Sequence, residues 1–382
     1  MADGRLSIEA PTLAGARLTI DLDAVAANWK MLDEMSGAAR CGAAVKGDGY
    51  GIGLETAVET LRDSGCRDFF VALPQEGLRA RSVDPAIRIF VLNGYMDGTA
   101  DMLIAHTLIP VLGSMEEIAD WNRQAAAAGR RLPAALHVDT GMNRLGLRVD
   151  EAMAIDETNP IFESVELCLL ISHLACGSDP AHPLNHRQLS AFRDVRARFP
   201  SVSASLSNSA GIFLGPDYHY DLCRPGIALY GGAALDAHAE DNPMRPVVRS
   251  EARILQVRSV AAGDGIGYGS AETAKRDTRV AIVACGYADG YHRRAGSAES
   301  RAGAVGFVGS DPVPAIGRVS MDLTAFDVTD CPPPGPQRGD WITMLGGPSP
   351  LARVAERAET IDYELLTGLG RRYERVYRRG TE

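Results

Sequence analysis

Short apolar runs alternate with helix-like stretches along the chain up to about residue 240. The runs have the length and composition of β-strands, and they span residues 18–22, 41–46, 69–73, 88–93, 108–112, 134–139, 166–174, 203–208 and 226–231. One helix is expected to begin after Ser114, because Glu117 completes a capping-box pattern three residues later. Near-continuous apolar strands that alternate with helices predict a parallel sheet covered by helices.

The number of these units favours a closed barrel. About eight strand–helix units within about 230 residues are typical of a TIM-like (β/α)8 barrel. An open, doubly wound sheet is the alternative, and the strand count does not separate the two. We therefore expect an α/β fold in which residues 1–244 form the barrel.

The pattern changes after about residue 245. Short β-rich runs follow one another, such as residues 252–260 and 279–287, and Gly- and Pro-rich turns separate them, as in PPPGPQRGD at 332–340. We expect residues 245–382 to form a separate, mostly-β domain.

Composition narrows the class of protein. The chain has 382 residues, more than one domain usually holds, and a formal net charge of −10 without a basic stripe, which argues against nucleic acid as a partner. We expect neither a signal peptide nor a membrane span. The seven cysteines are scattered and never spaced C-x-x-C, which suits free thiols in a reducing cytoplasm better than disulfides or a zinc site.

The stretch CGAAVKGDGYGIG at 41–53 ends an apolar run with Lys46 and continues with glycines. A buried lysine is costly, so its place at a strand end needs a reason. The glycines fit neither a P-loop, which needs G-K-S/T, nor the dinucleotide fingerprint G-x-G-x-x-G. A snorkelling lysine at a strand end is the simplest alternative to a chemical role.

Polar residues end several other predicted strands. Active groups of a (β/α)8 barrel sit at the C-terminal ends of its strands. The residues found there are Lys46, His137 with Asp139, His173, Asn208 with Ser209, and Arg224. Arg144 follows shortly after the run at 134–139, in DTGMNRLGL. Taken singly, each of these residues could have a structural role, but together they predict a functional site at this end of the barrel.

Short motifs along the chain resemble those of the alanine racemase family, in the same order. They are IDLDAVAAN, AVKGDGYG, HVDTGMNRLGL, SHLACG, SNSA, RPGIALYG, GIGYG, GYADGY, GRVSMD and TIDYELLT, between about residues 16 and 377. The family has a barrel domain, a C-terminal β domain and pyridoxal phosphate (PLP) as cofactor. The resemblance implies an isomerase that interconverts L-alanine and D-alanine and supplies D-alanine for peptidoglycan.

The resemblance assigns two catalytic bases. Lys46 matches the lysine that is bonded to PLP, and its freed amine serves as base for the α-proton of D-alanine. Tyr268, in GIGYG, matches the base for the L-enantiomer. The family's tyrosine comes from the neighbouring subunit, so the resemblance implies a homodimer with shared active sites.

Further residues match positions that bind the cofactor. Those expected at the PLP phosphate are Tyr50, Ser209 with its neighbour Asn208, the backbone N–H groups of Gly226 and Ile227, and Tyr363. Arg224 matches the arginine that faces the pyridine nitrogen, and because it stays charged the nitrogen is expected to stay unprotonated. His173 matches a histidine linked by hydrogen bonds to the second base.

For the substrate, the resemblance points to Arg144 and the backbone N–H of Met321 as the groups that bind the carboxylate. Tyr287, in GYADGY, and Arg293 match residues that line the channel through which substrate enters. The alternative for Tyr287 is an aromatic side chain that packs within the β domain. No metal ligand is expected.

The chain departs from the family pattern at His137. The family usually has a lysine there, often carbamylated, which holds the arginine at the Arg144 position. A histidine cannot carry a carbamate in that way. Either an anion such as chloride or another acidic group takes over this role, or Arg144 is held differently, and we expect no carbamylated lysine beside Arg144.

Two other segments differ from the family. Gly47-Asp48-Gly49 and Ile52 replace more usual residues, so we expect a looser loop and an added charge near the phosphate. The segment after His173 does not match the family's acidic pattern exactly. It contains His182 and His186, which we expect in an exposed loop rather than a metal site, because Pro183 interrupts a helix between them.

Other functions remain open on the sequence. A racemase for serine or for a broad set of amino acids fits the same motifs, because one methylene gives only about 1–3 kcal/mol of discrimination. A non-catalytic PLP carrier would resemble the barrel alone, without the β domain and its tyrosine. A decarboxylase of this fold would pair an acidic residue with the ring nitrogen, where this chain has Arg224.

Overall fold

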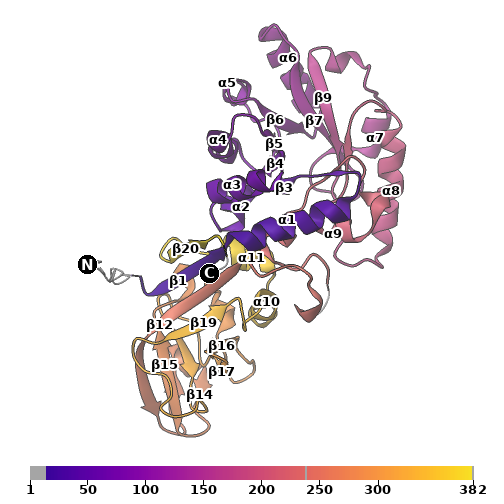
Figure 1. The fold of residues 1–382 in the computed structure, drawn as a ribbon. Helices are drawn as coiled ribbons and strands as arrows, with labels where there is room; N and C mark the ends of the chain where they lie inside the picture. Colours follow the sequence, from indigo (N-terminus) through magenta and orange to yellow (C-terminus); the bar gives the residue numbers. More distant parts are fainter. Residues whose placement is uncertain (1–13, 237–238, 381–382) are drawn as a thin grey trace, which may run out of the picture. The chain divides into compact units, whose positions relative to one another are not determined.

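The computed structural model describes residues 14–236 and 239–380, which divide into two compact units (Figure 1). The barrel unit comprises the described residues of 21–247 together with 379 and 380. The β unit comprises residues 14–20 and 248–378.

Parallel strands form the centre of the barrel unit. Their order in the sheet is β10-β9-β7-β6-β5-β4-β3, with bounds Ala204–Ser205, Val165–Ile171, Leu132–Asp139, Leu108–Leu112, Arg88–Val91, Asp68–Val71 and Ala43–Ala44. Every neighbouring pair is parallel, so the carboxyl ends of these strands meet at one edge of the sheet.

The sheet closes on itself. Strand β11 (Leu222–Cys223) pairs in parallel with β2 (Arg40–Cys41), which leads directly into β3. On its other side the chain around β11 continues β10, because the Asp221 N–H donates to the Ala204 carbonyl at 3.0 Å and the Arg224 N–H to the Ser207 carbonyl at 2.9 Å. The predicted (β/α)8 barrel is therefore confirmed, and the open doubly wound sheet was the wrong alternative.

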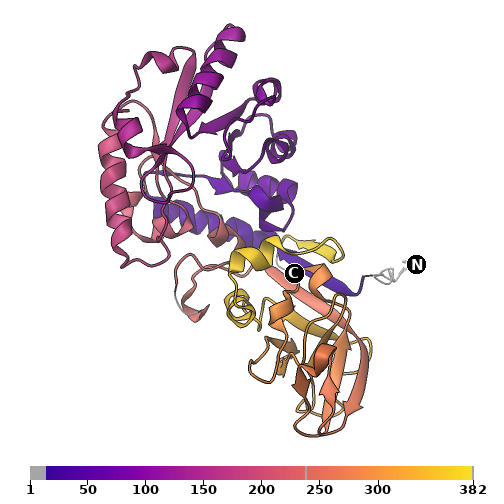
Figure 2. The ribbon, with the colours of Figure 1, turned by 180° about the vertical axis from the view of Figure 1, so that it is seen from behind.

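Helices separate the strands and lie outside them (Figures 1 and 2). They are α1 (Leu22–Ser36), α3 (Leu54–Ser64), α4 (Pro74–Val83), α5 (Ala100–Ala105), α6 (Met115–Ala127), α7 (Val149–Met153), α8 (Pro183–Arg196) and α9 (Ser209–Phe213). The helix predicted after Ser114 is confirmed: α6 begins at Met115, and the Ser114 hydroxyl accepts the Glu117 N–H at 3.1 Å. Ile118, Trp121 and Ala125 form its buried face.

The second unit is mostly β, as predicted, and its strand pairs are antiparallel. Its main order is β17-β16-β19-β12-β1-β20, with bounds Asp311–Pro314, Val305–Val308, Trp341–Leu345, Val248–Val260, Ala16–Asp21 and Glu374–Arg378. The second half of β12 pairs instead with β15 (Thr278–Val283), which pairs with β18 (Thr324–Asp327). Two short helices, α10 (Leu351–Ala358) and α11 (Asp362–Thr367), complete the unit.

The assignment of residues 18–22 to the barrel was wrong. Strand β1 pairs with β12 in the β unit, with Leu18 opposite Ser250. Ala16, Leu18 and Ile20 are buried while Arg17 and Thr19 between them are half-buried, an alternation that suits an antiparallel sheet rather than a barrel strand. The observed division therefore differs from residues 1–244 and 245–382, since the β unit also takes in β1 and resumes at Val248.

The run at 226–231 is not a strand. Residues Ile227–Tyr230 form a 3₁₀ helix, η3, and all four are fully buried. A short, continuously apolar run carries no period that separates a buried strand from a buried helical turn.

Among the residues that the structure describes, no helix has both the length and the apolar character needed to cross a membrane.

Removing the Leu18 side chain tests where β1 belongs. Leu18→Ala should lower the free energy of unfolding by about 2–5 kcal/mol, because the side chain is fully buried. Hydrogen exchange should accelerate at Val248 and Ser250, beside β1, and change little at Phe90 in the barrel strand β5. Faster exchange at Phe90 with Ser250 unaffected would contradict this assignment.

Candidate active site

Five polar positions gather at the C-terminal edge of the barrel strands. Lys46 follows β3, His173 follows β9, Ser209 follows β10 and Arg224 follows β11, while His137 lies near the end of β7. Burial lowers the pKa of His173, and Arg224, Arg144, Lys46 and His137 lower it further. The barrel residues that the sequence singled out therefore share one electrostatic environment.

A left-handed turn follows Lys46 in the segment α2 (Lys46–Tyr50). Gly47, Asp48 and Gly49 have φ of 64°, 56° and 63°, and Tyr50 follows at 50°. The Gly51 N–H closes the turn on the Gly47 carbonyl at 2.9 Å. Glycine adopts this conformation at little cost, whereas a side chain at Asp48 or Tyr50 adds strain. The expectation that the extra glycine loosens this loop stays a prediction.

An ion pair within the barrel unit neutralises the charge of Asp48. Its carboxylate pairs with Arg79 at 2.7 Å and accepts the Leu54 N–H at 3.3 Å. The Arg79 guanidinium also donates two hydrogen bonds to the Glu55 carboxylate, from Nε to Oε1 and from Nη2 to Oε2, each at 2.6 Å. The acidic residue that the sequence placed near the phosphate is therefore tied into an ion-pair network on the surface.

Lys46 itself is half-buried, and its ammonium has no hydrogen-bond partner in the described part of the chain. Burial lowers its pKa, the charge of Arg144 lowers it further, and Glu76 acts in the opposite direction. A lysine with a lowered pKa has more neutral amine near pH 7 than a free lysine, which is what a nucleophile or a base requires.

Hydroxyl and amide groups converge beside η3. The Ser209 hydroxyl accepts the Gly226 N–H at 2.8 Å and the Ala228 N–H at 3.3 Å, which leaves its own proton available to a ligand. A Cβ atom at Gly226 would lie 2.2 Å from the Tyr50 hydroxyl, so only glycine lets Tyr50 approach this closely. The Tyr50 ring stacks on Tyr230, with ring centroids 4.6 Å apart. These donors fit a phosphate group.

Asn208 supports this cluster from the adjacent position. Its side-chain oxygen caps α9 by accepting the Gly211 N–H at 3.0 Å, and its side-chain nitrogen lies 3.5 Å from Nε2 of His173. Asn208 thereby connects the position of Ser209 to that of His173. Ile227, the other predicted phosphate residue, begins η3 directly after Gly226.

Arg224 is a buried cation. Its guanidinium donates to the Ser172 carbonyl at 2.6 Å and to the Ser205 hydroxyl, and it lies over the Phe70 ring at 5.9 Å. Within the described residues no carboxylate pairs with it. Burial lowers the pKa of Arg224 to about 10, so it stays charged at neutral pH.

Both histidines near this cation are neutral at neutral pH. Burial, followed by the charge of Arg224, lowers the pKa of His137 to about 4. The same two causes, in the same order, hold the pKa of His173 well below its ordinary value. The site therefore avoids adding further positive charge beside Arg224 and Lys46.

Asp139 organises the loop that carries Arg144. Its carboxylate accepts the N–H groups of Gly141 at 2.8 Å, Met142 at 2.7 Å and Arg144 at 3.0 Å. Burial alone would raise the pKa of Asp139, but these backbone donors outweigh it and lower the pKa. Arg144 is thus held through its own backbone, which is one of the alternatives that the histidine at position 137 left open.

The remaining predicted residues belong to the β unit. Tyr268 lies in the 3₁₀ turn η5 (Tyr268–Ser270) with 70% of its surface exposed. Tyr287 and Met321 are neighbours, because the N–H groups of Tyr287 and Ala288 donate to the carbonyls of Ser320 and Met321, both at 3.0 Å. The other two predicted residues are Arg293, in η7 (Arg293–Ala295), and the exposed Tyr363, in α11.

Glu76 and Asp139 are site residues whose role the sequence analysis did not predict. Asp139 had a visible position at a strand end but no assigned task. Glu76 lies in the first turn of α4 after Leu73, and without a Ser, Thr, Asp or Asn at that N-cap the pattern is not a capping box in the sequence.

The loop prediction for the histidine pair was wrong. Helix α8 begins at Pro183, with His182 as its N-cap and the exposed His186 in its first turn. Proline suits the first helical position, where its missing N–H costs nothing. In the described residues no group of three or more His, Cys, Asp or Glu could hold a metal, and all seven cysteines are free thiols.

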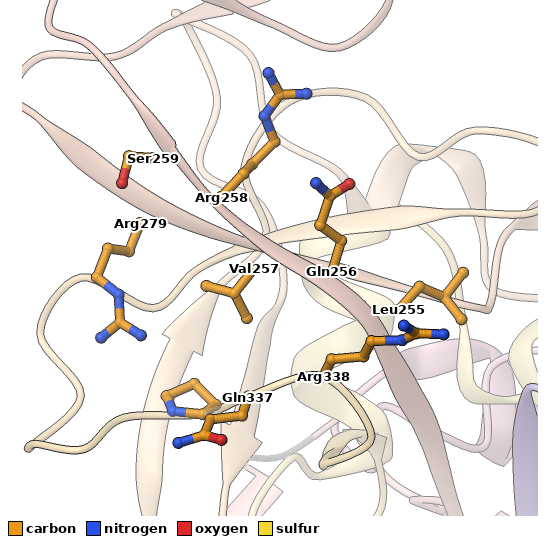
Figure 3. A pocket seen from close by; sticks show the side chains of 9 residues that line it. Leu255, Gln256, Val257, Arg258, Ser259, Arg279, Gln337 and Arg338 are labelled. Atoms are coloured by element: carbon orange, nitrogen blue, oxygen red, sulfur yellow. The ribbon is translucent and has the colours of Figure 1, made fainter.

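Figure 3 shows a groove on the β unit that none of the predicted site residues lines. It has a volume of about 620 Å³ and runs along residues 255–259 of β12, beside Arg279 and the loop 336–338. Arg258 and Arg279 point to opposite sides of the strand in Figure 3.

Comparisons with known proteins agree over nearly the whole chain. Family models match for the N-terminal domain of alanine racemase at residues 20–234 and for its C-terminal domain at 247–377. The biosynthetic alanine racemase of Agrobacterium fabrum is 49% identical over 372 residues, which cover 95% of this chain and 94% of the relative. The catabolic alanine racemase of the same organism is 44% identical, covering 95% and 92%.

The fold comparison agrees as well. The crystal structure of alanine racemase from Bartonella henselae with covalently bound pyridoxal phosphate matches with a TM-score of 0.89 and 38% sequence identity. The match covers 96% of this chain and 100% of that chain.

His137 should give the protein a measurable acid sensitivity. Its folded pKa of about 4 lies below the unfolded value of 6.5, so the unfolded chain binds more protons between these values. The contribution to stability is complete above pH 6.5 and is lost as pH falls toward 4. His137→Asn should flatten the fall in Tm over this range, measured by thermal unfolding.

The exposed His106 provides the matched control, and His106→Asn should leave the slope of Tm against pH as in the parent. A parent slope retained in His137→Asn would contradict a neutral, buried His137.

Proposed function

The chain belongs to the alanine racemase family, and from this premise we propose that it interconverts L-alanine and D-alanine by a two-base reaction with PLP at the C-terminal end of the barrel. The observation that carries the proposal is the position and environment of Lys46. Lys46 follows the barrel strand β3, its pKa is lowered, and it lies in one unit with a cluster of hydroxyl and amide donors that fits a phosphate.

The residues of the barrel unit fit PLP. Lys46 offers the amine for its aldehyde, and Tyr50, Ser209 and the Gly226 N–H offer donors for its phosphate. Arg224 offers a cation rather than a carboxylate to the pyridine nitrogen, which argues against a decarboxylase that needs this nitrogen protonated. When bound, PLP draws electrons away from the substrate α-carbon and makes its proton acidic.

Racemisation needs a proton removed from one face of the α-carbon and returned to the other. We assign removal from D-alanine to Nζ of Lys46, which its burial and Arg144 keep partly neutral. We assign removal from L-alanine to the phenol oxygen of Tyr268. The Arg144 guanidinium and the Met321 N–H would hold the carboxylate, with Asp139 fixing the Arg144 backbone.

The proposal includes a homodimer in which Tyr268 reaches the barrel of a second copy. In support of this, Tyr268 is 70% exposed and Met321 is 54% exposed, although both residue types are normally covered. Tyr287 and Arg293 would line the access channel, and Tyr363 would contribute to the phosphate site.

Relatives at similar identity include a biosynthetic and a catabolic enzyme, and the biosynthetic one is the more similar, at 49% against 44%. We therefore propose D-alanine supply for peptidoglycan, in the cytoplasm, as the role. Serine or broad-specificity racemisation is the second candidate. A non-catalytic PLP carrier is disfavoured by the presence of the β unit with its exposed Tyr268.

A panel of L-amino acids tests the proposed activity. The purified protein with PLP should yield D-alanine as the dominant product in chiral chromatography. Reduction of the bound cofactor and peptide mapping should place it on Lys46, which is one of three lysines, with Lys30 and Lys275 as internal controls. Dominant D-serine would favour the second candidate, and no D-product with PLP on Lys46 would indicate a carrier.

Tyr268→Phe separates the two bases. Racemisation of L-alanine should fall by roughly 100-fold or more, because a general base contributes about 10²–10⁴-fold. Exchange of the D-alanine α-proton with deuterium, followed by NMR, should continue through Lys46. Tyr377→Phe, a substitution of another exposed tyrosine, should keep the parent rate. A parent rate in Tyr268→Phe would contradict the two-base assignment.

A further inference from the structure

Helix α4 holds the left-handed turn behind Lys46 with two side chains that lie three residues apart. One carboxylate oxygen of Glu76 accepts the Gly47 N–H at 2.7 Å. The Arg79 guanidinium binds the carboxylate of Asp48 at 2.7 Å. Both contacts fall on the two residues directly after Lys46, where the chain has entered its left-handed conformation. The helix therefore fixes the direction in which the backbone leaves Lys46.

The second carboxylate oxygen of Glu76 is also bound. It accepts the Ala72 N–H at 2.8 Å and the Leu73 N–H at 3.2 Å, just past the end of β4. Capping of α4 accounts for these two contacts. It does not account for the contact with Gly47, which lies 29 residues away in sequence and joins the end of β3 to the end of β4. Three amides thus hold the carboxylate in one orientation.

Glu76 also supplies the negative charge that acts on the Lys46 amine. The charged and titratable groups facing Lys46 are Arg144 from the loop after β7, His173 after β9, and Glu76 from α4. Arg144 disfavours the ammonium form, and His173 is neutral. Glu76 alone of these three favours a proton on Lys46.

We propose that Glu76 is a positioning residue for the reaction. It fixes Lys46 through the Gly47 amide, and its negative charge stabilises the ammonium form that Lys46 adopts when its amine takes the proton from the substrate. This rests on the proposed function, in which Lys46 carries PLP and acts as a base. Glu76 acts through Gly47 and through its charge, without a contact to substrate or cofactor being required.

Capture of PLP by the full-length apo-protein tests the proposal, because only the neutral amine of Lys46 reacts. The rate of capture is followed by absorbance from pH 6 to pH 10 for the parent, Glu76→Gln, Glu76→Asp and Glu55→Gln. In Glu76→Gln the profile should move to lower pH, with roughly threefold faster capture near pH 7. In the loaded enzyme its kcat should fall by about tenfold while KM for alanine changes little.

The other variants separate charge from folding. Glu76→Asp keeps the charge and should keep the parent pH profile, which also provides the test if Glu76→Gln does not fold. Glu55→Gln removes a carboxylate that binds Arg79 on the same surface, and it should leave the profile unchanged. Thermal unfolding of each variant reports any loss of the α4 cap.

Two results would overturn the proposal. One is a Glu76→Gln capture profile that superimposes on the parent profile, which would reduce Glu76 to a helix cap. The other is a Glu76→Asp profile displaced to lower pH although the charge is kept. A parent protein that captures no PLP on Lys46 would instead contradict the proposed function.

Discussion

The concentration of positive charge at one end of the barrel constrains everything around it. Burial disfavours the charged forms of Lys46 and Arg224, and the charge of Arg144 further lowers the pKa of Lys46 and of His173. Burial and mutual repulsion both disfavour this arrangement. The chain tolerates it because the histidines stay neutral, Arg224 donates to a carbonyl and a hydroxyl, and an anion can be held nearby. A site of this kind is suited to a cofactor with a phosphate and a substrate with a carboxylate.

Much of this site could be predicted from the sequence, because the C-terminal ends of parallel strands must meet at one edge. The polar residue that ends each apolar run was visible, and the motif order gave the family. Strand β1 could not be assigned, since a run of five residues does not reveal which sheet it joins. The role of Glu76 could not be predicted either, because its contact with Gly47 depends on how two strand ends and a helix meet in space.

The departures from the family pattern become intelligible in the structure. The aspartate at position 48 brings a charge to the turn, and Arg79 from α4 neutralises it. The loop that carries Arg144 is fastened by Asp139 through backbone N–H groups, so its backbone does not depend on the residue at position 137. Both departures are accommodated by nearby contacts. The left-handed turn after Lys46 and the close approach of Tyr50 to Gly226 are kept.

The placement of β1 also affects how the chain is made on the ribosome. The barrel unit is nearly continuous in sequence, whereas the β unit needs Leu18 to pair opposite Ser250, and β20 completes its sheet only at Arg378. The first strand must therefore wait, unpaired, while the intervening barrel emerges and folds. Such distant pairing is slow to form, because a long loop has to close before any contact is gained. Co-translational folding of this protein should thus proceed from the middle of the chain outward, with its two ends joining last.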